Sequence, residues 1–193
     1  IKTSDFSESD IVFKKKCLNR FIANGFPGRK LENWKFSDLN QIIKKNIGEL
    51  SFYNDYSSSN KIDTSIFVDG LEHNKIIFIN GRVEQIDFDY EDKDKIEINE
   101  NFKLDNIFEN NSLIDLNGAF TNKCYKILIK KNYSLKKPLI VYHTTNNNID
   151  SKNINLRLEF QLEQNSSLKL IDLFNDSTKK NFINIFYNFD LKK

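Results

Sequence analysis

Strict alternation of apolar and polar residues in the last third of the chain constrains its fold most. Every second residue is apolar over 154–162, and the same pattern returns over 183–191. Because successive side chains of a β-strand point to opposite faces of a sheet, this period predicts strands with one buried face. Shorter apolar runs predict further strands over 124–130, 139–144 and 168–174. No long helix is predicted between these strands.

An Asn-Gly pair predicts a β-hairpin earlier in the chain. Asn80 and Gly81 separate an apolar run over 76–79 from a second strand-like run over 82–88. Both central residues of a type I′ turn need positive φ, which Asn and Gly adopt most readily. A further short strand is predicted over 96–99, followed by a helical turn over 112–119.

The first fifty residues carry helical patterns. Ser7 or Ser9 is predicted to cap a helix that runs to about Asn24, where Gly25 ends it. Ser37 is predicted to cap a shorter amphipathic helix that ends near Gly48. The Ser- and Asn-rich stretch 53–63 has the composition of a loop and is the best candidate for a linker.

These patterns divide the chain into four parts. We predict an N-terminal helical segment over 1–52, a linker over 53–74, a hairpin region with a connecting segment over 75–122, and the first strands of a β core over 123–193. The fold class is therefore mainly β with an N-terminal helical segment, in the form of a sandwich, a barrel or a stacked β-solenoid. The edge of the last strand is expected to need a partner or further chain.

Composition excludes several classes of function. The 29 cations and 27 anions leave a formal charge of +2, which indicates no nucleic-acid partner. No apolar stretch reaches the roughly 20 residues that span a bilayer, and no secretory signal precedes the first helix, so we expect no membrane partner and a cytoplasmic location. Two widely spaced cysteines fit a reducing compartment. The chain starts at Ile1 and contains no Met, so it is predicted to be part of a longer product.

The segment 26–39 concentrates residues that suit a docking function. It holds Pro27 and Gly28, three cations and the only Trp of the chain. We predict that Trp34 fills a pocket where the helical segment meets the β core, with Arg29 and Glu32 paired around it. The alternative, that Trp34 stacks on a nucleic-acid base, is weaker because the rest of the chain supplies no basic and aromatic stripe.

This segment resembles the N-terminal signature of the SufD family, subunits of the SufBCD iron–sulfur cluster assembly scaffold. Gly28 stands where the family usually has Thr, and Phe36 replaces a usual Tyr. Two weaker likenesses extend the resemblance over nearly the whole chain, the hairpin at 77–82 and the Lys-Pro-Leu strand at 136–143. The residues that match the signature are Pro27, Arg29, Lys30, Glu32, Trp34, Lys35, Phe36, Ser37 and Leu39.

The resemblance implies a fold and a function. It implies a helical N-terminal domain followed by the start of a right-handed parallel β-helix. It also implies a non-catalytic scaffold subunit that pairs with a SufB-like subunit and a SufC-like ATPase, while the full complex assembles the iron–sulfur cluster. The functional positions of the D-type subunit lie beyond Lys193, so no catalytic or cofactor-binding residue is carried over to this chain. Whether the chain forms a homodimer stays open.

The residues themselves supply little catalytic chemistry. No Gly-rich phosphate loop and no nucleophile motif is present. Cys17 and Cys124 are expected to pack as small apolar residues, and His143 to be a hydrogen-bonded structural imidazole. The metal ligands, if there are any, are unknown. The acidic run is expected to be a solvated hairpin rim. The candidate ligands are Cys17, Cys124, His73, His143, Asp87, Asp89, Glu91, Asp92 and Asp94.

Two other functions stay open at this point. One is a β-solenoid or β-sandwich enzyme that processes polysaccharides, with acids such as Asp87 and Asp89 near a groove. The other is an adaptor module whose N-terminal helices bind a partner.

Overall fold

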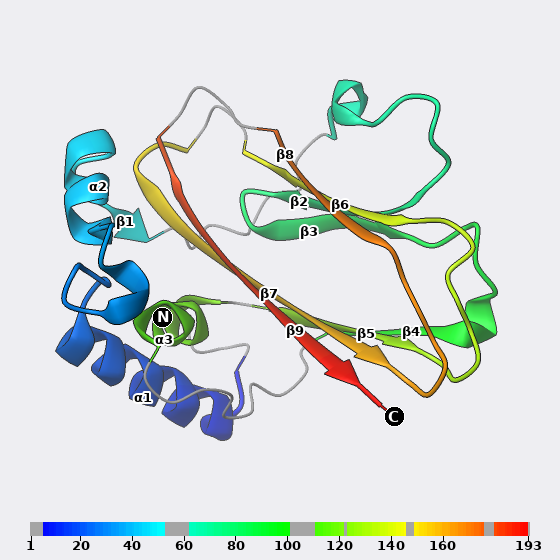
Figure 1. The fold of residues 1–193 in the computed structure, drawn as a ribbon, viewed down its shortest axis with the longest axis horizontal. Coiled ribbons are helices and arrows are strands. Elements are labelled where there is room, and N and C mark those ends of the chain that lie inside the picture. Colours follow the sequence, from blue (N-terminus) through cyan, green and yellow to red (C-terminus); the bar gives the residue numbers. More distant parts are fainter. Residues whose placement is uncertain are drawn as a thin grey trace.

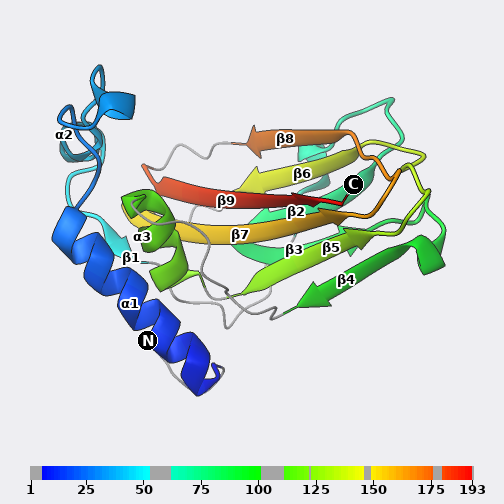
Figure 2. The same cartoon turned by 60° about the horizontal axis from the view of Figure 1, so that its bottom comes forward.

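The computed structural model describes residues 6–52, 62–100, 111–121, 123–145, 149–175 and 180–192. Two β-sheets face one another, and the helices gather at one end of them (Figures 1 and 2). The α-helices are α1 (Glu8–Asn24), α2 (Leu39–Asn46) and α3 (Ser112–Phe120), and the 3-10 turns are η1 (Glu32–Trp34), η2 (Thr64–Ile66) and η3 (Lys93–Lys95). The strands are β1 (Ser51–Phe52), β2 (Asn74–Ile79), β3 (Arg82–Asp87), β4 (Ile96–Glu100), β5 (Cys124–Ile129), β6 (Leu139–Thr144), β7 (Lys152–Leu162), β8 (Leu170–Asn175) and β9 (Phe182–Leu191).

The chain alternates between the two sheets from β5 onward. Sheet A has the order β1-β7-β5-β4, with β9 also paired to β7, and sheet B has the order β3-β2-β6-β8. The pairs β5–β7, β7–β9, β2–β6 and β6–β8 are parallel, whereas β2–β3 and β4–β5 are antiparallel. Each sheet therefore joins strands that are distant in sequence, and the stability of the fold depends on long-range contacts.

The main core lies between the two sheets. Its fully buried members come from strands of both sheets, and their apolar side chains fill the space between the layers. These residues are Ile76, Phe78, Tyr125, Ile127, Leu139, Val141, Leu156, Leu158 and Phe160. The alternating pattern that predicted β7 therefore places Leu156, Leu158 and Phe160 in this core.

The fold class predicted from the sequence is wrong. We expected a mainly β chain that begins a right-handed parallel β-helix. The structure is a mixed α/β fold with two separate sheets and three α-helices in the described residues, and a parallel β-helix is not seen. Alternation identified the strands correctly, but it says nothing about which strand pairs with which. The antiparallel edges β3 and β4 and the packing of α3 on β7 and β9 are tertiary features that no local period encodes.

The predicted helices are confirmed, with changes at their ends. Ser7 caps α1: its hydroxyl accepts from the backbone N–H of Asp10, and the Asp10 carboxylate accepts from the backbone N–H of Ser7. Helix α2 is capped by Asp38 rather than by Ser37. Helix α3 is a full helix of nine residues, capped by Asn111, where only a turn was expected.

The predicted linker is partly outside the described residues. Residues 53–61 are not described. Beyond them, Ile62, Ile66 and Phe67 pack against a second apolar cluster on the outer face of sheet B, which includes Ile140 and Tyr142. The segment after residue 61 is therefore a packed cover of sheet B.

The Asn-Gly hairpin is confirmed. Asn80 and Gly81 have φ of 53° and 78° between β2 and β3. A Cβ atom added to Gly81 would collide with Cγ2 of Ile154 on β7. The position therefore requires Gly for its backbone conformation and for its close approach to sheet A.

We expect Gly81→Ala to lower the free energy of unfolding by about 1–3 kcal/mol more than Gly70→Ala, because only Gly81 adds a collision to the strain of positive φ. Gly70 has φ of 72° and no atom within 4 Å of its added Cβ, so it isolates the backbone cost. Urea denaturation of both variants measures the difference. Equal losses would contradict the close approach to Ile154.

Candidate interaction site

The sandwich is open along its edge strands β8 and β9, and we call this margin the open end. In the described part of the chain, β8 pairs only with β6 and β9 only with β7. Side chains that point into the space between the sheets reach solvent here: Phe174 is 59% exposed, Phe189 47% and Leu191 66%. Phe189 also stacks on the core residue Phe160, with ring centres 5.2 Å apart. The open end thus exposes the margin of the core itself.

A hydrogen-bonded triad links the two sheets beside this open end. The Tyr187 hydroxyl, on β9, donates to Oδ1 of Asp172, on β8, over 2.5 Å. Nε2 of His143, on β6, lies 3.1 Å from the same oxygen and 2.9 Å from the Tyr187 hydroxyl. Because the Tyr187 proton is directed at the carboxylate, Nε2 carries the hydrogen that it shares with Asp172. Burial and the nearby Asp172 raise the pKa of Tyr187, so this hydroxyl remains a donor.

The imidazole of His143 is clamped between aromatic rings. Phe78 stacks at 5.4 Å and Phe174 at 4.7 Å between ring centres, from the neighbouring strands of sheet B. Its Nδ1 atom is buried and has no hydrogen-bond partner. The prediction of a hydrogen-bonded imidazole is confirmed at Nε2. It does not hold at Nδ1, which makes no hydrogen bond.

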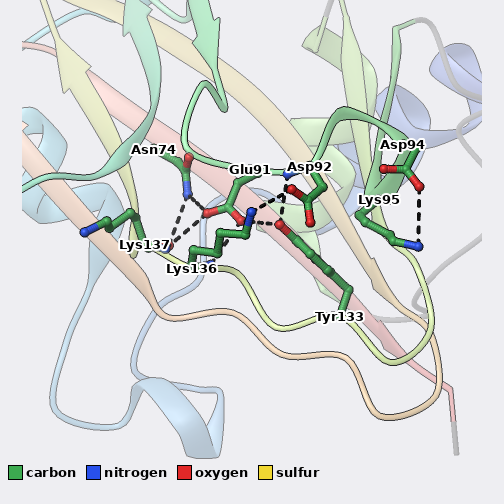
Figure 3. Close-up of polar contacts among 8 residues, drawn as sticks. All are labelled: Asn74, Glu91, Asp92, Asp94, Lys95, Tyr133, Lys136 and Lys137. Carbon is green, nitrogen blue, oxygen red and sulfur yellow. Dashed lines mark hydrogen bonds and ion pairs between the residues drawn. The ribbon is translucent and has the colours of Figure 1, made fainter.

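Glu91 is the best-bonded carboxylate of the acidic run (Figure 3). Its oxygens accept from Nδ2 of Asn74 at 2.7 Å and the Tyr133 hydroxyl at 2.8 Å, and from the backbone N–H groups of Lys136 and Lys137 at 3.0 and 3.1 Å. These four donors come from β2 and from the loop between β5 and β6. Glu91 therefore ties the segment after β3 to both of them.

The environment of Glu91 lowers its pKa. Burial alone would raise the pKa, but the hydrogen bonds from the Lys136 backbone, Asn74, Tyr133 and the Lys137 backbone outweigh burial. The prediction of a solvated rim was wrong for this residue, because Glu91 is buried. The two lysines that follow Tyr133 in sequence gave no signal that their backbone would bind a carboxylate.

Three of the other acids of the run are held in ion pairs. Asp87 lies 3.0 Å from Lys75, Asp92 2.6 Å from Lys136, and Asp94 3.4 Å from Lys95. Asp89 is exposed, and its backbone N–H donates to Asp87. The structure therefore engages Asp87 with a lysine across the β2–β3 hairpin.

The cysteines and His73 lie apart from the open end. Cys17 on α1 and Cys124 on β5 are both free and buried, as expected. Burial raises the pKa of both thiols, that of Cys124 to about 11. Nε2 of His73 and the Tyr142 hydroxyl form a hydrogen bond of 2.7 Å. Among the residues that the structure describes, no three His, Cys, Asp or Glu side chains group in a way that holds a metal ion.

In the segment 26–39, which we call the elbow, Phe26 and not Trp34 makes the ring contacts found among the described residues. Its ring meets Phe21 on α1 at 5.2 Å and Phe182 on β9 at 5.7 Å, both edge to face. Trp34 is half-buried, and Glu32 pairs with Lys35 instead of Arg29. A lone Phe before Pro27 carried no signal that it, and not the Trp, would join the helical segment to sheet A.

No protein-family model matches this chain, and no curated protein matches it in sequence. Within the described ranges, no helix is long and apolar enough to cross a membrane.

We expect Glu91→Gln to lower the free energy of unfolding by about 2 kcal/mol, because the amide nitrogen of Gln faces donors where the carboxylate accepted. The pKa of Glu91 is lower in the folded than in the unfolded state. Its contribution is therefore present above the ordinary value of 4.5 and lost as pH falls through the lowered value. Urea denaturation between pH 3 and 7, with Glu97→Gln on the exposed edge as control, measures both effects. An unchanged pH profile would refute this role of Glu91.

We expect Tyr187→Phe to cost about 1–2 kcal/mol of unfolding free energy, since Asp172 and Nε2 of His143 both lose the hydroxyl between the sheets. Tyr90→Phe, at an exposed position, is the control. Thermal unfolding monitored by calorimetry provides the measurement, and equal melting temperatures for the two variants would argue against the link between the sheets.

Proposed function

We propose that this chain is a non-catalytic scaffold subunit of the SUF iron–sulfur cluster assembly machinery, which pairs with a SufB-like subunit and a SufC-like ATPase in the cytoplasm. The observation that carries the proposal is the elbow sequence, in which nine residues between Pro27 and Leu39 match the SufD signature. The signature joins Pro, Arg, Glu and Trp at fixed spacings, so a chance match is rarer than for a short Gly-rich motif. The proposal does not depend on a β-helix.

The open end of the sandwich supports a scaffold role. Edge strands have backbone N–H and C=O groups that can pair with the strands of another protein. Here two edges, β8 and β9, lie side by side in opposite sheets, and exposed aromatic side chains separate them. A partner that presents strand edges at the same spacing would extend both sheets and cover Phe174 and Phe189. A SufB-like subunit fits this description as a homologous chain.

The division of labour also fits a scaffold. The chain has no Gly-rich phosphate loop, so nucleotide hydrolysis belongs to the SufC-like partner in this proposal. The cluster is a product of the complex, to which this chain contributes a binding surface.

Co-purification tests the proposal. We expect the tagged full-length product, expressed in its own cells, to retain SufB-like and SufC-like proteins identified by mass spectrometry. Phe174→Lys and Phe189→Lys each place a charge on the open end, and we expect at least about tenfold less of the SufB-like protein to be retained. Val12→Lys, at an exposed position of α1, is the control.

The results separate two failures. If the wild-type product retains neither partner, the proposed function is wrong. If it retains both and the lysine variants, with unchanged melting temperature, retain them equally, the function stands and the open end is not the binding surface.

A further inference from the structure

Two buried cations lie between the helices and the outer face of sheet A. Arg157 is on β7, where it alternates with the core residues Leu156 and Leu158 and therefore points away from sheet B. Lys14 is on α1. Both residues are only 2% exposed. Within the described ranges, no ion pair of 4.0 Å or less joins either of them to a carboxylate.

Arg157 has unused hydrogen-bond donors. The carbon of its guanidinium lies 4.5 Å from the centre of the Phe186 ring, so one face is stacked. Two of its nitrogens, Nε and Nη1, are buried and have no hydrogen-bond partner. An arginine does not lose its proton in a protein, so a full charge remains in this interface with donors unmet. Such a group destabilises the fold unless an acceptor reaches it.

Lys14 adds a second charge to the same place. Its Nζ donates to the carbonyl oxygen of Thr121 and lies 4.4 Å from the centre of the Phe6 ring, and neither partner neutralises it. Burial, with a smaller contribution from the positive charge of Arg157, lowers the pKa of Lys14 to about 8. Both groups are therefore close enough to interact, and Lys14 is still mostly protonated at pH 7.

The acidic groups nearby are engaged elsewhere. Asp115 on α3 is bound by Arg20, and Glu159 on β7 lies 3.2 Å from Lys126. Cys124 pairs with Arg157 across β5 and β7, but its thiol is neutral because burial raises its pKa to about 11. Asp10 on α1 accepts hydrogen bonds from Ser7. Arg20 binds Oδ1 of Asp115, whereas Oδ2 of Asp115 is buried without a hydrogen-bond partner. Within the described ranges, none of these carboxylates lies within ion-pair distance of Arg157 or Lys14.

We propose that this interface binds a small oxyanion of the phosphate or sulfate class, which accepts hydrogen bonds from Arg157 and Lys14. Such an anion has several acceptor oxygens, so it can meet Nε and Nη1 of the guanidinium and the remaining N–H groups of the ammonium at once. It would also connect α1 to sheet A, so binding stabilises the fold. This inference is independent of the proposed scaffold function.

Thermal unfolding of the full chain in inorganic phosphate tests the site. The measurements are made at pH 7 and constant ionic strength, with sodium chloride replaced stepwise by sodium phosphate or sodium sulfate. We expect the melting temperature of the wild type to rise saturably, by about 5 °C or more at ~100 times the dissociation constant. Arg157→Met should abolish the rise, whereas Arg29→Met, at an exposed position, should leave it unchanged.

Chloride alone provides a second readout. Arg157→Met removes an unpaired buried charge, so in chloride we expect it to melt at the same temperature as the wild type or higher. If Arg157→Met does not fold, Lys14→Met decides the question, with an expected dissociation constant for phosphate at least about tenfold higher. The inference is overturned if neither phosphate nor sulfate shifts the wild type beyond chloride, or if the folded variants respond as the wild type does.

Discussion

A single apolar layer between two sheets holds this protein together. The layer is built from alternate residues of strands that the chain places first in one sheet and then in the other, so its packing depends on contacts between segments distant in sequence. Gly81 illustrates how closely the sheets approach, because the turn of the β2–β3 hairpin packs directly on Ile154 of the opposite sheet. Where the layer ends, at β8 and β9, its aromatic side chains are exposed.

Polar residues inside the fold fix elements that the apolar layer does not reach. Glu91 gathers four donors from β2 and from the loop before β6, and so fixes the irregular segment after β3. Asn117 on α3 donates to the carbonyl oxygens of Leu156 and Asn184, which sets this helix on β7 and β9. Arg157 and Lys14 lie in the same helix–sheet interface without equivalent partners. In this interface the amide of Asn117 has hydrogen-bond partners, whereas Nε and Nη1 of Arg157 have none.

The proposed scaffold role would need a stable body and an exposed apolar surface, and in this structure the margin of the core at β8 and β9 is such a surface. The triad of His143, Asp172 and Tyr187 joins the two sheets near that margin, so the edges of β8 and β9 are held relative to one another before any partner binds. A preorganised edge loses less conformational entropy on association than a flexible one.

The sequence by itself determined the local elements, because their signals are local: a serine cap at the start of α1, the Asn80-Gly81 turn, and the period of two in β7 and β9. It did not determine how strands are shared between the sheets, which is why a β-helix was expected and a mixed α/β fold with two separate sheets was found.

The sequence also did not determine whether the polar face of β7 is exposed or buried. Alternation assigns Asn155, Arg157 and Glu159 to the face opposite the core, and a solvated face is the simplest reading of that pattern. Only the tertiary structure covers this face with α3, on which α1 packs in turn, because whether a polar face meets water or another element depends on segments that lie far away in the chain.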